Sequence, residues 1–120
     1  MIADDNAGIR LLYKTLLKDA GHEIVAESDN GLEALETYLN SPPDLLIIDN
    51  KMGKMNGIDV VRHILQSHRD AKIIMCTANC WEIASEAMKL GVFKVVSKPF
   101  HIEDFIATIS NSLETTTHKQ

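Results

Sequence analysis

Short apolar runs alternate along this chain with longer segments in which apolar residues recur at helical spacing. The runs at 45–48 and 73–76 contain only Leu, Ile, Met or Cys. Such unbroken runs are typical of strands that are buried on both faces of a parallel sheet. The segment 102–113 shows the other pattern, with apolar residues at i, i+3, i+4, i+7 and i+11, and indicates an amphipathic helix.

The same two patterns divide the whole chain into five strands and five helices. We expect the strands at 1–3, 23–26, 45–48, 73–76 and 92–96. We expect a helix after each strand, and Gly21, Pro42 and Gly91 stand where three of these helices should end. This alternation predicts an α/β domain, with a doubly wound parallel sheet of five strands and helices on both faces.

Length and composition exclude several classes of protein. The 120 residues are enough for one domain, and 45% hydrophobic with 24% charged residues is ordinary for a globular protein. Lys and Arg number 12 against 17 acidic residues, and this net charge of −5 counts against nucleic-acid binding through a basic face. No apolar run approaches the roughly 20 residues of a membrane span, and no secretion signal is visible. We therefore expect a cytoplasmic domain that binds neither nucleic acid directly nor membranes.

The cysteines, histidines and methionines form no motif of their own. Cys76 and Cys80 lack a second ligand pair at zinc spacing, so we interpret them as reduced thiols, one in a strand and one in a loop. The five histidines share no ligand spacing, and we interpret Met52 and Met55 as packing residues. Trp81 has two open interpretations, an exposed contact for a partner or local packing at the start of a helix.

Polar residues follow four of the expected strands closely. Asp4 and Asp5 follow the first, Asp49 the third, Thr77 the fourth and Lys98 the fifth. In a doubly wound sheet, ligands bind beyond the carboxyl ends of the strands, so these side chains should meet at one rim. Three carboxylates there repel one another unless a cation intervenes, and oxygen ligands without His or Cys favour Mg²⁺ or another hard ion.

This set of side chains suits phosphoryl chemistry. Aspartate nucleophiles form acyl phosphates, so Asp49 could attack phosphorus while the metal and Lys98 neutralise the phosphoryl oxygens and Thr77 donates a hydrogen bond. Taken one at a time, the same residues have plainer interpretations, as helix-capping aspartates, a turn aspartate, a strand threonine and a loop lysine. Their shared position at strand ends favours a common site for phosphoryl chemistry over these separate structural roles.

At these residues the sequence resembles the receiver domain of two-component response regulators, the family of the single-domain chemotaxis regulator. The matching pieces are spread over nearly the whole chain, at residues 2–6, 46–49, 52, 55–57, 77–78 and 97–100. The resemblance implies a flavodoxin-like three-layer sandwich with strand order 2-1-3-4-5. We assign residues 1–114 to the receiver domain and 115–120 to a polar tail.

The resemblance also implies how a metal ion is held. Asp49 would be the phosphoacceptor, and Asp5 and Asp49 would bind Mg²⁺ directly. Asp4 would act on the ion through water, and the backbone carbonyl of Lys51 matches the remaining protein ligand of the family.

The remaining implied roles concern the phosphoryl group. Lys98 would be its counter-ion, and the bond from Lys98 to Pro99 would be cis, which an X-Pro bond allows at modest cost. Thr77 would supply the hydroxyl that moves toward the phosphoryl group on activation. The backbone N–H groups of Lys51 and Ala78 would contact phosphate.

The function that follows is a phosphorylation switch. A sensor histidine kinase or phosphotransfer protein would present a phosphohistidine, and Asp49 would take the phosphoryl group in a Mg²⁺-dependent reaction. The domain would catalyse only its own phosphorylation and dephosphorylation, so we do not expect an enzyme that acts on an outside metabolite. The acyl phosphate would shift a two-state equilibrium toward a conformation with a face that binds a downstream protein.

The chain is either a stand-alone regulator or a receiver from a larger protein with an output domain, and the sequence names neither the kinase nor the target.

Two other functions compete with this interpretation. One is a binding module that is never phosphorylated and works by constitutive protein contact. The other is an enzyme, either an aspartyl-phosphate phosphatase or a nucleotide-binding protein, and the sequence disfavours both. Lys51 stands where the phosphatase needs a second carboxylate, and no glycine-rich turn follows the first strand.

Several positions depart from the family pattern or vary within it. Val95 stands where receivers usually carry Tyr or Phe, so we hypothesise that the aromatic part of the switch is missing or replaced by other groups. Gly53 stands where proline is usual, which predicts a looser loop at 50–54 without metal. The first strand is short, so either the sequence begins inside a longer chain or the central strand is shortened. Lys51 and Asn79 occupy variable positions that, in this family, tune how fast water reaches the acyl phosphate.

Overall fold

The computed structural model describes residues 1–114, and the predicted polar tail at 115–120 lies outside the described residues. Five parallel strands form one sheet: β1 (Ile2–Ala3), β2 (Glu27–Ser28), β3 (Leu46–Ile48), β4 (Ile73–Thr77) and β5 (Lys94–Ser97). Each strand is followed by a helix: α1 (Ala7–Asp19), α2 (Gly31–Asn40), α3 (Gly57–Ser67), α4 (Cys80–Leu90) and α5 (Ile102–Glu114). The strand order across the sheet is β2-β1-β3-β4-β5, which confirms the predicted doubly wound α/β fold.

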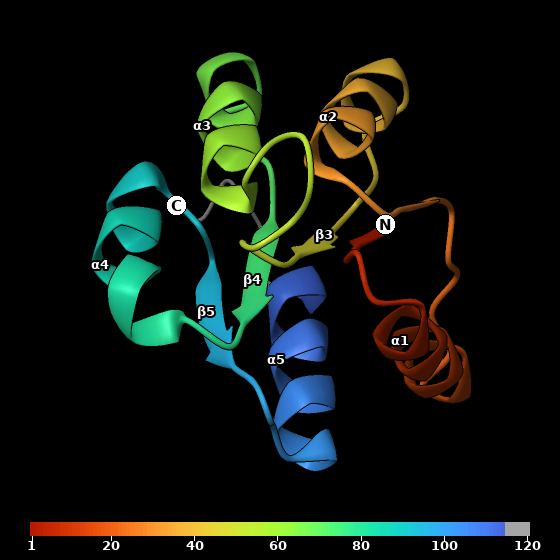
Figure 1. Ribbon diagram of the computed structural model, residues 1–120. Coiled ribbons are helices and arrows are strands. Elements are labelled where there is room, and N and C mark those ends of the chain that lie inside the picture. The colour runs from red at the N-terminus through yellow and green to blue at the C-terminus, as the bar shows by residue number, and fades with distance from the viewer. Residues whose placement is uncertain (115–120) are drawn as a thin grey trace.

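The helices cover both faces of the sheet and bury one apolar core on each face (Figure 1). On one face α2, α3 and α4 pack against Ala3, Ile48 and Met75. On the other face α1 and α5 pack against Ile2 and Ile74. Successive strand residues point to opposite faces, so a strand covered on both sides must be apolar throughout. Within residues 1–114, no helix is long and apolar enough to cross a membrane.

The second strand does not lie where the apolar pattern predicts it. It was expected at 23–26 and is found at Glu27–Ser28, so that prediction was wrong. The register pairs Ile2 with Glu27, so residues 23–25 extend past the start of β1, where β1 offers them no pairing partner. Ile24 packs partly against the core of α1 and α5, which explains its apolar character, while Val25 is 58% exposed.

Smaller differences concern the fifth strand and one cysteine. Val92 was expected to begin the fifth strand, but it is buried in the turn after α4, where its N–H donates to the carbonyl of Ala87. β5 therefore starts at Lys94. Cys80 is the first residue of α4 and not a loop residue, whereas Cys76 is buried in β4, and both are free thiols. Burial raises the pKa of Cys76 to about 11.

Candidate functional site

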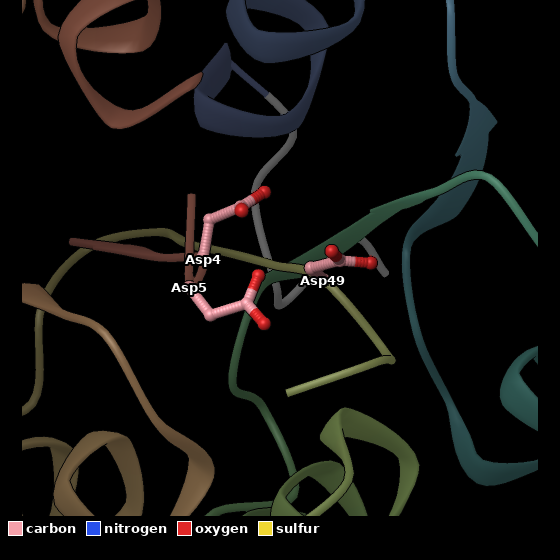
Figure 2. Close-up of side chains that lie close together, drawn as sticks. All are labelled: Asp4, Asp5 and Asp49. Atoms are coloured by element: carbon pink, nitrogen blue, oxygen red, sulfur yellow. The ribbon is translucent and has the colours of Figure 1, made fainter. Parts of the chain in front are cut away.

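The carboxyl ends of β1 and β3 bring three carboxylates together. β1 lies beside β3 in the sheet, so Asp4 and Asp5 lie next to Asp49. One carboxylate oxygen from each residue lies within 4.8 Å of the other two, and Figure 2 shows the three side chains close together. Asp4 and Asp49 are buried, and Asp5 is exposed at the rim. The structure therefore confirms that these three acids meet at the carboxyl ends of the strands.

Lys98 reaches the same cluster from the end of β5. Its Nζ lies 2.6 Å from Oδ2 of Asp4 and 3.3 Å from Oδ2 of Asp49. Burial by itself lowers the pKa of Lys98, but the hydrogen bond to Asp4 and the charges of both aspartates outweigh it and raise the pKa. The peptide bond between Lys98 and Pro99 is cis, as predicted. One ammonium faces three carboxylates, so the cluster has an excess of negative charge that a divalent cation would offset.

Asp49 uses one carboxylate oxygen and leaves the other without a partner. Its Oδ2 accepts from Lys98, whereas its Oδ1 is buried and has no hydrogen-bond partner among residues 1–114. Buried polar atoms normally have a partner, because the loss of water is costly. An unsatisfied carboxylate oxygen in an all-oxygen donor set fits a hard divalent cation such as Mg²⁺, which Asp4, Asp5 and Asp49 could hold.

Contacts from α1 and β2 hold Asp4 in place. Its N–H donates to the carbonyl of Ser28 at 3.1 Å, and its Oδ1 accepts from the N–H of Asn6 at 2.9 Å. Arg10 of α1 donates from Nη1 to the Asp4 carbonyl at 2.7 Å and from Nε to Glu27 at 3.0 Å. Sequence reasoning missed Arg10 and Glu27, because their role depends on how α1 meets the edge of the sheet, which neither residue type signals.

Asn50 and Gly57 shape the loop after β3. The carbonyl of Asn50 accepts the N–H of Gly57 at 2.7 Å, and its Oδ1 accepts the N–H of Ile58 at 2.9 Å. A Cβ atom on Gly57 would lie 2.1 Å from the carbonyl oxygen of Asp49, so this close approach requires glycine. Lys51 follows Asn50 and is exposed. The role of its carbonyl as a metal ligand stays a prediction.

Thr77 lies buried at the end of β4, between the strands that carry Asp49 and Lys98. Its carbonyl accepts the N–H of Lys98 at 3.0 Å, which ties β4 to the lysine. Its hydroxyl donates to Oδ1 of Asn79 and accepts from the N–H of Asn79 at 3.4 Å. The hydroxyl that the sequence assigns to the phosphoryl group is therefore bonded to the first residue before α4.

Other residues of interest lie outside the acidic cluster. Val95 pairs with Met75 in the sheet and packs, partly buried, against the core of α2, α3 and α4. Met52 and Met55 also pack against this core, which confirms their interpretation as packing residues. Trp81 is 97% exposed on α4, so its interpretation as local packing was wrong.

Sequence comparisons place this fold and site in a known family. The response regulator receiver domain family matches residues 1–110. The chemotaxis protein CheY of Thermotoga maritima is 39% identical over 101 residues, which cover 83% of this chain and 84% of the relative. The chemotaxis protein CheY of Bacillus subtilis is 35% identical over 114 residues, covering 94% of this chain and 95% of the relative.

Structural comparisons agree with the sequence. A response regulator receiver domain protein from Clostridium thermocellum superposes with a TM-score of 0.85 at 29% identity, covering 93% of this chain and 90% of the other. The complex of CheX with CheY, BeF₃ and Mg²⁺ from Borrelia burgdorferi contains the same fold, with a TM-score of 0.89 at 21% identity, covering 95% of this chain and 87% of that one. The chain belongs to the response regulator receiver domain family. It is a response regulator of two-component signal transduction, similar to the chemotaxis regulators.

Proposed function

We propose that Asp49 accepts a phosphoryl group from the phosphohistidine of a sensor histidine kinase or phosphotransfer protein. The observation that carries this proposal is the contact of Asp49 with Lys98 inside an acidic cluster, where one Asp49 oxygen is buried without a partner. A carboxylate oxygen attacks phosphorus, the phosphorus–nitrogen bond breaks, and the imidazole leaves with the electron pair of that bond. The product is an acyl phosphate on Asp49.

Lys98 and Thr77 act on the oxygens of the transferring group. The ammonium of Lys98 already lies 3.3 Å from Asp49, so it faces the place where negative charge has to be stabilised. Thr77 ends the strand beside Asp49 and donates one hydrogen bond once its hydroxyl leaves Asn79. Both residues come from the carboxyl ends of neighbouring strands, which places them beside Asp49.

Asp4, Asp5 and Asp49 are the side chains that would hold Mg²⁺, with the backbone carbonyl of Lys51 as the further protein ligand. When bound, the ion supplies positive charge that neutralises the phosphoryl oxygens. The unpartnered oxygen of Asp49 supports this assignment. The Borrelia burgdorferi complex, which contains a chain of this fold, holds CheX and CheY together with BeF₃ and Mg²⁺.

In this role the chain acts on no outside metabolite and is not a metabolic enzyme, because it catalyses only its own phosphorylation and autodephosphorylation. Its proposed partners are a phosphohistidine donor and a downstream protein or output domain, all in the cytoplasm. The net charge of −5 supports the proposal that this domain does not bind nucleic acid directly.

The test is the mass of the protein after incubation with acetyl phosphate and Mg²⁺. We expect a gain of about 80 Da, the mass of one phosphoryl group. The gain should disappear in Asp49→Asn and when Mg²⁺ is chelated. Asp59→Asn is the matched control, because Asp59 lies on α3 in a surface pair with Arg62 and should not affect the reaction. An unmodified wild-type protein would favour the rival binding module that is never phosphorylated.

A further inference from the structure

Asparagine side chains cap three helices of this protein at their N-termini. Asn6 caps α1 and Asn30 caps α2, each by accepting an N–H three residues further along, at 3.0 and 2.8 Å. Asn50 supplies the equivalent bond to the start of α3. Asn79 stands at the same position before α4, but its side chain makes no hydrogen bond to that helix.

The side chain of Asn79 is bound to Thr77 instead. The hydroxyl of Thr77 donates to Oδ1 of Asn79 and accepts a hydrogen bond from the backbone N–H of Asn79, so two hydrogen bonds join these residues. The backbone of Asn79 has φ −100° and ψ 40°, whereas Asn6 and Asn30 are extended, with ψ 116° and 161°. The residue that should cap α4 is therefore held toward the rim of the acidic cluster.

We propose that Asn79 is a positioning residue whose side chain passes from Thr77 to α4 when Asp49 is phosphorylated. This inference rests on the proposed function. A hydroxyl carries one proton, so Thr77 cannot donate to a phosphoryl oxygen and to Asn79 at the same time. The N–H of Glu82 donates to the backbone carbonyl of Asn79 at 3.0 Å in this structure. Once the hydroxyl turns to the phosphoryl group, the amide oxygen of Asn79 accepts the N–H of Trp81, or replaces that carbonyl as the acceptor for Glu82, the positions that a helix cap normally binds.

The exchange replaces one set of satisfied hydrogen bonds by another. Before phosphorylation Thr77 satisfies Asn79, and the first turn of α4 lacks the side-chain cap that α1 and α2 have. After phosphorylation the Thr77 hydroxyl donates to a phosphoryl oxygen. The amide oxygen of Asn79 then accepts a backbone N–H in the first turn of α4. The backbone at Asn79 becomes extended in the second state, which moves the start of α4. This route from the site to α4 needs no aromatic side chain on β5, where the chain has Val95.

Trp81 provides a fluorescence signal for this change of hydrogen-bond partner. It is the single tryptophan of the chain, the second residue of α4, and 97% exposed. Ser85 and Met88 follow at helical spacing and are also exposed, so the surface that begins at Trp81 shifts with the first turn.

The experiment compares wild type, Asn79→Ala, Asn79→Ser and Asn56→Ala before and after treatment with acetyl phosphate and Mg²⁺. The readouts are amide hydrogen exchange at residues 81–82, Trp81 fluorescence and the intact mass of each sample. Asn56→Ala is the matched control, because Asn56 precedes α3 and also makes no side-chain cap bond. In wild type and in Asn56→Ala, phosphorylation should slow exchange at these amides about fivefold, the factor expected from one helix cap. The emission of Trp81 should change in parallel.

The two asparagine variants separate a capping role from a merely structural one. Asn79→Ala should still gain the mass of one phosphoryl group, whatever the lifetime of that group, and its phosphorylated molecules should show no slower exchange at 81–82. Asn79→Ser retains a capping oxygen and should restore most of the slowing. Equal slowing in Asn79→Ala, or a failure of Asn79→Ser to restore it, would overturn the inference and leave the proposed function intact. Absence of the mass gain in wild type would overturn the proposed function and this inference with it.

Discussion

The ammonium of Lys98 lies 2.6 Å from the carboxylate of Asp4, although 94 positions separate them in the sequence. This bond joins the ends of β5 and β1, between which β3 and β4 lie in the sheet. The side chains of Asp4 and Lys98 are 1% and 17% exposed, so both charges have lost most of their water. Removing either partner therefore leaves a buried charge without compensation. This lowers the free energy of unfolding more than breaking an exposed pair does.

Replacing Lys98 by methionine should destabilise the fold, because it leaves buried carboxylates without a cation. We expect a loss of about 3–5 kcal/mol in the free energy of unfolding, the range for breaking one partner of a buried pair. Mg²⁺ should recover part of the loss, since the proposed ion would bind only the folded cluster and would supply positive charge there. Urea unfolding with and without Mg²⁺ measures both effects.

The control for this variant is Lys14→Met. Lys14 pairs with Glu27 at 2.9 Å, but their side chains are 31% and 37% exposed. An exposed pair of this kind contributes about 0–1 kcal/mol. Equal losses in Lys98→Met and Lys14→Met would show that burial of the Lys98 pair has no effect on stability.

The same pair predicts a loss of stability at alkaline pH. Burial lowers the pKa of Lys98, but Asp4 and Asp49 together raise it above the ordinary value of 10.5. A lysine whose pKa is higher in the folded state stabilises the fold below its unfolded pKa, and this stabilisation is lost as the pH rises through the folded pKa. The stability advantage of wild type over Lys98→Met should therefore be constant near neutral pH and shrink above about pH 10. An advantage that persists unchanged at about pH 12 would contradict this assignment.

The sheet and the acidic cluster could be predicted because they depend on strong local signals. Unbroken apolar runs mark β3 and β4, since a strand covered by helices on both faces has no polar side. The carboxyl ends of parallel strands meet at one rim, so a residue just after a strand can be assigned to the site without knowing its contacts. Asp4, Asp49 and Lys98 were found in this way, and the structure brings them together.

Features that depend on how two elements meet could not be predicted from the sequence. Within residues 1–114, β2 is an edge strand that pairs only with β1, so its position follows from the register and not from the apolar residues at 23–26. The bond from Arg10 to Asp4 depends on the approach of α1 to the sheet. The bond from Thr77 to Asn79 depends on side-chain rotamers, which spacing does not define.

Gly57→Ala should disturb the loop that follows Asp49. The new Cβ would lie 2.1 Å from the carbonyl oxygen of Asp49, so the backbone must shift to admit it. We expect a destabilisation of about 1–3 kcal/mol, as for other overpacked positions. Calorimetric titration should also show weaker Mg²⁺ binding, because the shift displaces Asp49, one of the proposed metal ligands.

Gly53→Ala is the same substitution four residues earlier, in the loop between β3 and α3, at a position where a Cβ atom would meet nothing within 4 Å. It should leave Mg²⁺ affinity unchanged and raise stability by about 0.4–1 kcal/mol, because alanine has fewer conformations in the unfolded chain. If Gly57→Ala binds Mg²⁺ as tightly as Gly53→Ala does, the close approach at Gly57 has no role in placing Asp49.

Arg10 should strengthen Mg²⁺ binding by anchoring the backbone of Asp4. Its Nη1 donates to the Asp4 carbonyl at 2.7 Å, while its Nε donates to Glu27 at 3.0 Å. Arg10→Lys keeps the positive charge but loses the planar fork that reaches both acceptors, so the anchor is lost while the electrostatics are nearly preserved. Loss of one such hydrogen bond should weaken Mg²⁺ binding roughly fivefold to tenfold in calorimetric titration. Lys14→Ala, which removes only a contact to Glu27, should bind Mg²⁺ as wild type does. Wild-type affinity in Arg10→Lys would mean that the bonds of Asp4 to Ser28 and Asn6 are sufficient to hold it.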